Sequence, residues 1–283
     1  MHGSHDPAIL EVGRKAWGNL ELLHVVGYFA PETQAAYEAL GLKGRTGYFA
    51  SRSAAMGAVD APMTVATFYV FAPRAVEGVL PQAWSVASPE QVTQARRDGV
   101  AAALQRVLGD VDVEEAVTLA RTACEALTAP GRPLYAAHTS LPWPQDPLMQ
   151  LWHAATLIRE HRGDGHIAAL VQAGLGPLEA LVINGQVAGN TEFLQKRRGW
   201  APEEWAATRA SLHEQGLLND ALQLSEAGHA MYAGLELQTE RAASPGWAHL
   251  GLAGTERLVE LVKPLRLAVQ ADEHTPDWLG RRR

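Results

Sequence analysis

The sequence has a single cysteine, Cys124, and no long apolar run. One cysteine excludes a disulfide within the chain and is typical of a protein in a reducing compartment. A transmembrane helix needs about 20 consecutive apolar residues, and no run approaches that length. Residues 1–6 lack the charged and apolar regions of a signal peptide. We therefore expect a cytoplasmic protein that does not contact a membrane.

Positive charge is also scarce in this chain. It carries 24 Lys and Arg against 31 Asp and Glu, which gives a formal net charge of -7. A protein that binds nucleic acid has to neutralise phosphate groups, so this balance argues against DNA as the main partner. We expect a small polar or anionic ligand as the partner instead, and a homo-oligomer stays open.

The motifs of common cofactors and nucleophiles are missing. The chain has no Gly-x-x-x-x-Gly-Lys-Ser/Thr loop, no Gly-x-Gly-x-x-Gly fingerprint and no Gly-x-Ser-x-Gly elbow. It also has no His-Glu-x-x-His motif, and Cys124 has no cysteine partner. We therefore predict no cofactor and no metal site. One alternative stays open: a two-histidine metal site of His161 and His166 completed by Asp164 or His24, or haem ligation by one of these histidines.

What the sequence does have is apolar residues at helical spacing. Hydrophobic residues make up 47% of the chain, enough for a packed core, and they recur every three to four positions. This pattern predicts a mostly all-α protein. The proline-rich residues 130–147 predict a boundary between an N-terminal helical domain, residues 7–146, and a second domain, residues 147–283.

The second half predicts a winged helix-turn-helix. Helical patterns cover residues 147–160, 166–173, 177–183 and 202–215, and Ser225 caps a long helix to about residue 242. Between the last two, residues 217–224 predict two short strands around a tight turn. The segments LHEQGLL (212–218) and LQLSEAG (222–228) resemble the end of the recognition helix, the wing and the next helix of MarR-type proteins.

A wider resemblance covers nearly the full length of the chain. It rests on HVVGYFAPE (24–32), YFASR (48–52), ATFY (66–69) and above all LWHAATLIREHRGDGH (151–166). These segments resemble an actinobacterial family of helical proteins that carries a helix-turn-helix label. The resemblance implies a helical fold and the place of a site, and no established reaction.

Two groups of polar residues predict that site. Glu21, His24 and Tyr28 share one face of the first predicted helix, and a Glu21–His24 pair would favour a protonated imidazole. Arg52 with Met56 and Tyr69 would add an anion-binding arginine and an aromatic floor. The second group is a predicted charged turn at residues 161–166, where Asp164 caps the following helix. The residues of this second group are His153, Arg159, His161, Arg162, Asp164 and His166.

We expect these two groups to form opposite walls of one pocket between the domains. The protein would be a small-molecule-binding protein or a cofactor-independent acid/base enzyme. In the enzyme, His161 or His166 would be the base oriented by Asp164, His24 a second proton carrier, and Arg52 and Arg162 the clamps for an anion. The alternative is a ligand-responsive DNA-binding regulator or a repair protein.

Overall fold

The computed structural model describes residues 5–276 and 279, and this part of the chain is built from fourteen α-helices and two short 3₁₀ helices. The all-α prediction is therefore correct. The predicted two-stranded wing is wrong, because residues 217–224 form only one isolated antiparallel bridge, between Leu218 and Leu224, and no strand forms in the described residues. The two segments exchange only the Asn219 N–H to Gln223 carbonyl and Ser225 N–H to Leu217 carbonyl bonds, while the Gln186 side chain accepts from the Leu224 N–H at 2.8 Å and donates to the Leu222 carbonyl at 3.0 Å.

Proline and side-chain caps set most helix starts, as the sequence predicted. Ser88 forms a capping box with Gln91 at the start of α6, and the Ser225 hydroxyl accepts from the Gly228 N–H at the start of α13. The α-helices are α1 (Pro7–Phe29), α2 (Pro31–Ala39), α3 (Arg45–Ser53), α4 (Ala61–Phe68), α5 (Pro73–Glu77), α6 (Pro89–Leu108), α7 (Glu114–Glu125), α8 (Pro133–Thr139), α9 (Pro147–Gln172), α10 (Pro177–Ala188), α11 (Thr191–Arg197), α12 (Pro202–Glu214), α13 (Glu226–Ala243) and α14 (Pro245–Ala271). The 3₁₀ helices are η1 (Ala54–Met56) and η2 (Gln82–Ser85).

Helix α9 overturns the predicted turn at residues 161–166. It is one continuous helix of 26 residues, so these residues lie in its interior. Asp164 caps α8 instead of a following helix: its carboxylate accepts from the Tyr135 N–H at 2.9 Å. Gly165 is needed because a Cβ there would lie 2.6 Å from the Arg132 guanidinium, which donates to the carbonyls of His161 and Ala242.

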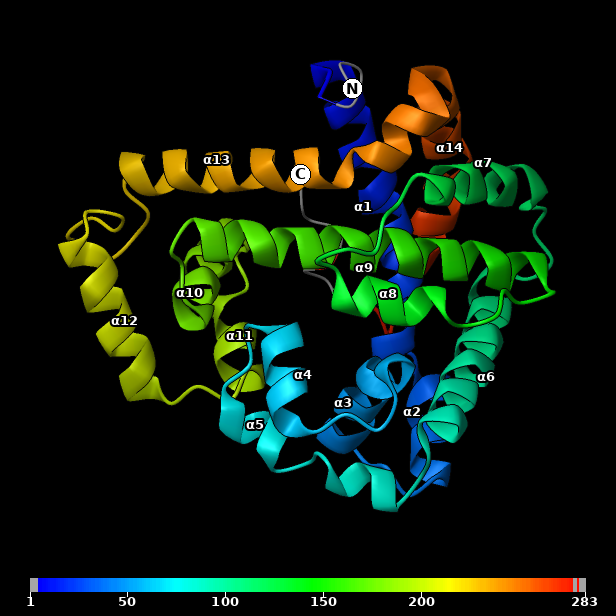
Figure 1. Ribbon diagram of the computed structural model, residues 1–283, viewed down its shortest axis with the longest axis horizontal. Coiled ribbons are helices and arrows are strands. Elements are labelled where there is room, and N and C mark those ends of the chain that lie inside the picture. Colours follow the sequence, from blue (N-terminus) through cyan, green and yellow to red (C-terminus); the bar gives the residue numbers. More distant parts are fainter. Residues whose placement is uncertain (1–4, 277–278, 280–283) are drawn as a thin grey trace.

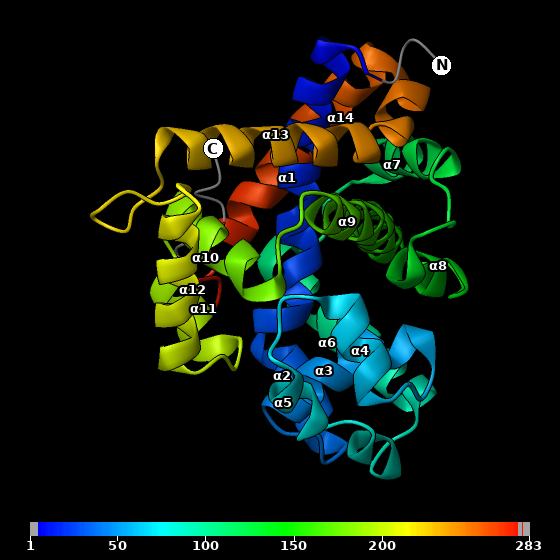
Figure 2. The same ribbon diagram turned by 60° about the vertical axis from the view of Figure 1, so that its left-hand side comes forward.

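The helices pack around three apolar clusters. The largest joins α1, α6, α7, α9 and α14, and includes Leu20, Leu104, Leu151 and Leu258. A second cluster lies among α2–α6, and a third holds the end of α9 against α10–α13. Figure 1 shows α9 crossing the centre of the molecule with α13 running beside it, and Figure 2 shows α14 lying along α1. The first cluster thus takes side chains from both sides of residue 147, and the division predicted there stays a prediction.

Among the described residues, no single helix is long and apolar enough to cross a membrane. Helices α9 and α10 together are long and apolar enough to span a membrane, but they are bent by 112° at the break between them.

Candidate functional site

Three polar residues of α1 face the middle of α9: Glu21, His24 and Tyr28. His24 is fully buried, and its ring lies between the two helices. Its Nδ1 lies 3.0 Å from the Thr156 hydroxyl and its Nε2 lies 2.7 Å from the Tyr28 hydroxyl. The Thr156 hydroxyl donates to the Trp152 carbonyl, so it accepts from His24 Nδ1–H. This assigns the Nδ1–H tautomer, in which Nε2 accepts the proton of the Tyr28 phenol.

The imidazole of His24 is uncharged, contrary to the prediction of a protonated ring paired with Glu21. Burial, followed by the positive charges of Arg159 and Arg96, holds the pKa of His24 well below its usual range. The acidic group nearest to the ring is Glu160, whose Oε1 lies 3.8 Å from Nε2. The sequence could not show this, because the arginines that oppose protonation come from other helices.

In one part of this region the charge of a buried arginine, Arg159, is balanced by carboxylates. Arg159 Nη1 donates to Glu160 Oε2 at 2.6 Å, and Arg159 Nε lies 3.7 Å from Glu21 Oε2. Burial would raise the pKa of Glu160, but Arg159 and Arg52 outweigh it and lower this pKa to about 2. One arginine therefore serves two carboxylates, and Glu160 stays ionised.

Three further arginines reach the same region without a carboxylate partner. No carboxylate of a described residue lies within the 4.0 Å of an ion pair from Arg52, Arg96 or Arg198. Arg52 and Arg96 are 8% and 4% exposed. Instead of carboxylates, aromatic rings face the guanidinium groups. The centre of the Phe68 ring lies 4.1 Å from Arg52 Cζ, and the centre of the Phe71 ring lies 4.4 Å from Arg198 Cζ.

Their hydrogen bonding is also incomplete. Arg52 Nη1 donates to the Tyr48 hydroxyl at 3.1 Å, and Arg96 Nη1 donates weakly, at 3.4 Å, to the Ser51 carbonyl and to His138 Nε2. The buried Nε of Arg52, Nε of Arg198, and Nε and Nη2 of Arg96 have no acceptor. Buried donors are almost always paired in folded proteins, so this concentration of unpaired donors makes the region the candidate site. We call Arg52, Arg96, Arg159 and Arg198 the arginine cluster.

The cluster also acts on a tyrosine. Burial would raise the pKa of Tyr48, but the charges of Arg52 and Arg198 outweigh it and lower this pKa to about 8. His138 is uncharged at neutral pH, because burial lowers its pKa to about 4. Positive charge in this region therefore comes from arginine and not from histidine.

A small pocket opens on the Arg96 side of the cluster. It encloses about 320 Å³ of space between α3, α6, α8 and α9, part of it open to solvent. Most of its lining residues are polar or aromatic, and among them are Arg96, Arg97, His138, Trp152, His153 and Thr156. Trp152 Nε1 and His153 Nε2 are buried without a partner, and burial lowers the pKa of His153 to about 3. The pocket thus offers donors and positive charge but no carboxylate.

The structure brings together only part of the predicted site. Glu21, His24, Tyr28, Arg52 and Arg159 lie in the region of the arginine cluster, and His153 lines the adjoining pocket. The others serve different contacts, and the catalytic roles predicted for the histidines and Asp164 stay predictions.

The remaining predicted residues lie elsewhere. Those on α9 do so because the continuous helix turns their side chains to other faces. His161 packs edge-on against Tyr135, and His166 Nδ1 lies 2.9 Å from the Thr239 hydroxyl on α13. Arg162 bonds to Glu240 at 2.8 Å. The Tyr69 hydroxyl donates to the Leu175 carbonyl at 2.5 Å, and Met56 packs against the second apolar cluster. Within the described residues, no group of three His, Cys, Asp or Glu side chains could hold a metal ion.

Several residues of the site were not predicted, among them Tyr48, Arg96, His138 and Arg198. Arg198 stands beside Lys196 and Arg197 in the sequence, but it follows α11 and turns inward against Phe71. Arg96 faces inward from α6, a helix that also carries exposed charged residues. A useful signal would have been an arginine at an inward-facing position of a helical pattern.

A model of a helix-turn-helix family matches residues 13–276, nearly the whole described chain. The protein therefore belongs to this helix-turn-helix family. The MarR-type resemblance and the actinobacterial origin of the family stay predictions. No curated protein and no solved structure matches the chain.

Proposed function

We propose that this member of the helix-turn-helix family binds a small anionic molecule at the arginine cluster. The observation that carries the proposal is an excess of positive charge: the buried Arg52 and Arg96 and the half-buried Arg198 lack carboxylate partners, and four of their buried nitrogen atoms lack acceptors. A carboxylate or phosphate group would supply both the charge and the acceptors.

Energetics support a ligand over a purely structural role. An unpaired buried charge costs several kcal/mol, even after relaxation. Apolar side chains of similar size would fill the same space without that cost, so arginines at these positions weaken the unliganded fold. Guanidinium groups suit such a site because their planar fork matches the two oxygens of a carboxylate or phosphate.

The pocket beside Arg96 limits the size of the ligand. Its 320 Å³ includes space open to solvent, and the part that water-sized spheres can enter has room for about one water molecule. His153 Nε2 and Trp152 Nε1, which are buried without a partner, can contact a small polar molecule, while the rest of the Trp152 ring provides an apolar face. We therefore expect a compact carboxylate or phosphate compound.

A thermal-shift assay with phosphate, sulfate, acetate and citrate at constant ionic strength tests the proposal. We expect at least one of these anions to raise the Tm of the wild type in proportion to its concentration. Arg96→Met should abolish this response and leave the unliganded protein at least as stable as the wild type. The matched control is Arg45→Met, which removes the same charge from an exposed position on α3 and should keep the response. Loss of stability in Arg96→Met, with no anion acting on the wild type, would contradict the proposal.

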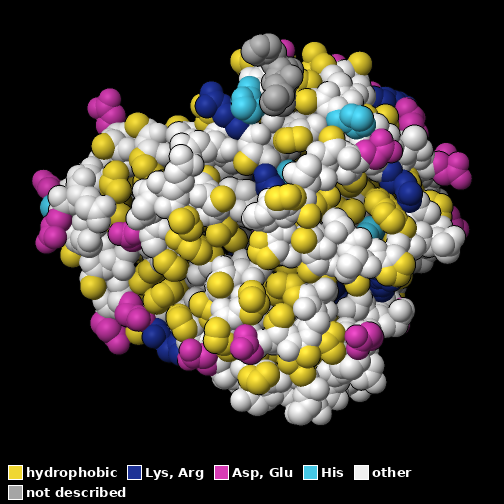
Figure 3. Space-filling view, in the orientation of Figure 1, with side chains coloured by type: hydrophobic (Ala, Val, Ile, Leu, Met, Phe, Trp, Pro, Cys, Tyr) yellow, Lys and Arg dark blue, Asp and Glu magenta, His cyan; other side chains and the backbone are white. Residues whose placement is uncertain are grey.

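DNA binding is the second candidate, and family membership is the observation that favours it. The charge around α12 does not. Its first turn carries Glu203 and Glu204, and Arg74 of α5 forms a bidentate pair with Glu204. Figure 3 shows mainly acidic groups along the left edge, over α12, and no gathered basic patch on that face. Salt-dependent binding to random duplex DNA, measured by fluorescence anisotropy, would favour this candidate, and no binding at low salt would exclude it.

A further inference from the structure

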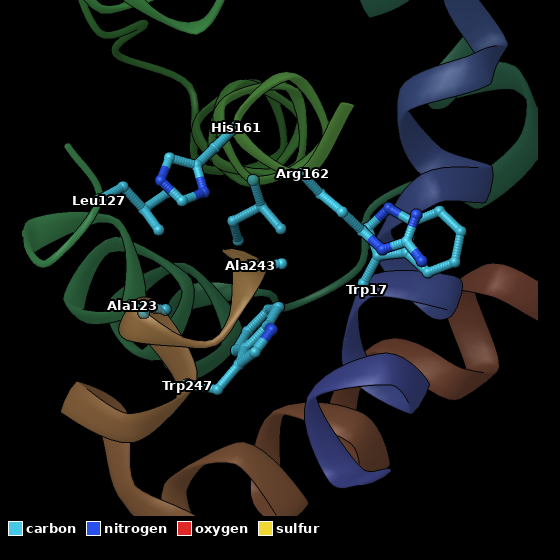
Figure 4. Close-up of a pocket in the computed structure, with 9 residues that line it drawn as sticks. Trp17, Ala123, Leu127, His161, Arg162, Ala243 and Trp247 are labelled. Atoms are coloured by element: carbon cyan, nitrogen blue, oxygen red, sulfur yellow. The ribbon is translucent and has the colours of Figure 1, made fainter. Parts of the chain in front are cut away.

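Helix α13 has an inner face that packs on α9 and an outer face of exposed residues. On the inner face, Glu236 and Glu240 accept hydrogen bonds from Arg162. Figure 4 shows Arg162 reaching from α9 toward Trp17 of α1, and Figure 1 shows α13 along the upper edge of the molecule. The outer face consists of exposed residues that lie within about 100° of one another around the helix axis: Glu226, Ala230, Ala233, Gly234, Leu237 and Arg241.

The middle of this outer face is uncharged and closely shaped. Leu237 is 43% exposed, and the residues beside it, Ala230, Ala233 and Gly234, are small. A glycine inside a helix destabilises it relative to alanine. A Cβ at Gly234 would meet nothing within 4 Å, so packing within the chain does not require this glycine. Glycine at such a position suits the close approach of a second backbone.

The charges at the two ends make the outer face complementary to a second copy of itself. A two-fold axis can pass between Ala233 and Gly234, in the middle of the face. Glu226 of one copy then lies opposite Arg241 of the other, because each is about 11 Å from the axis at 1.5 Å per residue. Neither side chain forms an ion pair within the part of the chain that the structure describes. A parallel arrangement would place each charge beside its own copy, which is unfavourable.

We propose that a second copy of this chain docks on the outer face of α13, so that the two helices form an antiparallel pair. Leu237 of each copy packs over Ala230 of the other, and two Glu226–Arg241 pairs close the ends. A two-fold interface uses the same surface on both copies, so that surface has to carry both charges, as this one does. One helix pair buries less than the roughly 1,200–2,000 Å² of stable complexes, so we expect a dissociation constant in the micromolar range.

Sedimentation equilibrium of the full-length protein across the micromolar range tests the proposal by charge reversal. Glu226→Arg and Arg241→Glu should each weaken the dimer about tenfold or more, because like charges then meet at both ends. The double variant pairs opposite charges again and should return to nearly the wild-type dissociation constant. The control is Ala253→Arg, which adds a charge at an exposed position of α14 and should change nothing. A monomeric wild type, or no recovery in the double variant, would overturn the proposal.

Disulfide cross-linking tests the antiparallel orientation independently. Gly234→Cys brings two sulfur atoms together at the axis and should give a covalent dimer on oxidation. Glu226→Cys should not, because its two copies would lie about 22 Å apart. Both variants keep Cys124, so the wild type is the control and should stay uncross-linked. Circular dichroism establishes that each variant is folded, and the cysteine variants keep the test valid if a charge reversal does not fold. Cross-linking through Glu226→Cys alone, or through neither position, would overturn the proposal.

Discussion

Tyr48 has a phenol held among guanidinium groups, and this placement has a measurable consequence. Its pKa is about 8 in the folded protein, against 10.0 in an unfolded chain. Below about pH 8 the phenol is protonated in both states and contributes nothing. Between pH 8 and 10 only the unfolded state keeps the proton, so the free energy of unfolding rises with pH.

We therefore expect the wild type to gain stability over Tyr48→Phe as the pH rises from 8 to 10. The gain should reach up to about 2 kcal/mol, since one pKa unit corresponds to about 1.4 kcal/mol. Urea unfolding at several pH values measures it, and tyrosinate absorbance should show a titration near pH 8 that Tyr48→Phe lacks. A constant difference between the two proteins across this range would refute the placement of Arg52 and Arg198 around the phenol.

Asp164 gives the opposite dependence on pH. Burial raises its pKa from 3.8 to about 6, although the Tyr135 N–H stabilises the carboxylate. The folded protein therefore holds more protons than the unfolded chain between these values, and stability falls as the pH rises from about 4 to 6. Asp164→Asn keeps an acceptor for α8 without the charge. It should be more stable than the wild type above pH 6, by up to about 3 kcal/mol, and the gain should vanish below pH 4.

Chemical denaturation across this pH range measures the effect, and the acidic end of the series is its own control. If Asp164→Asn were equally destabilised at every pH, Asp164 would act only through hydrogen bonding and the raised pKa would be wrong.

At the scale of the residue, the sequence identified site residues that share one helix. It missed those that other helices bring to the site. Glu21, His24 and Tyr28 were found because a polar stripe on an apolar helix is visible in one segment. Arg96 and Arg198 were missed because nothing near them in sequence shows that they point inward. The protonation of His24 was wrong for the same reason, since its lowered pKa depends on burial and on arginines from other helices.

At the scale of one element, α9 depends on two glycines with different surroundings. A Cβ at Gly165 would lie 2.6 Å from Arg132 Nη1 and 3.1 Å from Ala242 Cβ, whereas a Cβ at Gly163 would meet nothing closer than 3.9 Å. In a helix interior, replacing glycine by alanine normally stabilises by about 1 kcal/mol. We expect Gly163→Ala to show this gain.

Gly165→Ala should have the opposite sign and destabilise by about 1–3 kcal/mol, because overpacking displaces the Arg132 bridge between α9 and α13. The pair of variants shares one helix and one chemical change, so thermal unfolding of both isolates the effect of the neighbours. A stabilised Gly165→Ala would show that Arg132 moves aside without cost and that this bridge is unimportant.

Helix starts could be predicted from the sequence, but the continuity of α9 could not, and the same two glycines are the reason for this failure. Proline and capping residues act on their immediate neighbours, so the bounds of α1 and α6 follow from local sequence. Two glycines among charged residues favour a turn when only local sequence is considered. Here Asp164 and Arg162 find partners on α8 and α13, and packing on both sides outweighs the cost of the glycines.

At the scale of the whole molecule, the largest apolar cluster joins the two ends of the chain. Trp247, Leu258 and Val262 of α14 pack with residues of α1 and α7, and Leu151 of α9 completes the same cluster. Within the described residues, α1 therefore lies among helices from both sides of residue 147. Hydrophobic burial is the main stabilising contribution to a fold, so removing either half takes away part of this largest cluster, although the buried residues of the second and third clusters each lie within one half.

A fragment of residues 1–146 should therefore not fold cooperatively. In it, α1 would expose fully buried side chains such as Leu20 and Leu23, and His24 would lose its contact with Thr156. We expect low helicity, no sharp thermal transition and dye-binding apolar surface. Mixing with a fragment of residues 147–283 should restore helicity, because the two surfaces are complementary. Full-length protein cleaved between the same residues would be the control for the break itself. A cooperative transition in the isolated N-terminal fragment would show that it is an independent domain, as the proline-rich boundary predicted, and that α14 only covers a core formed without it.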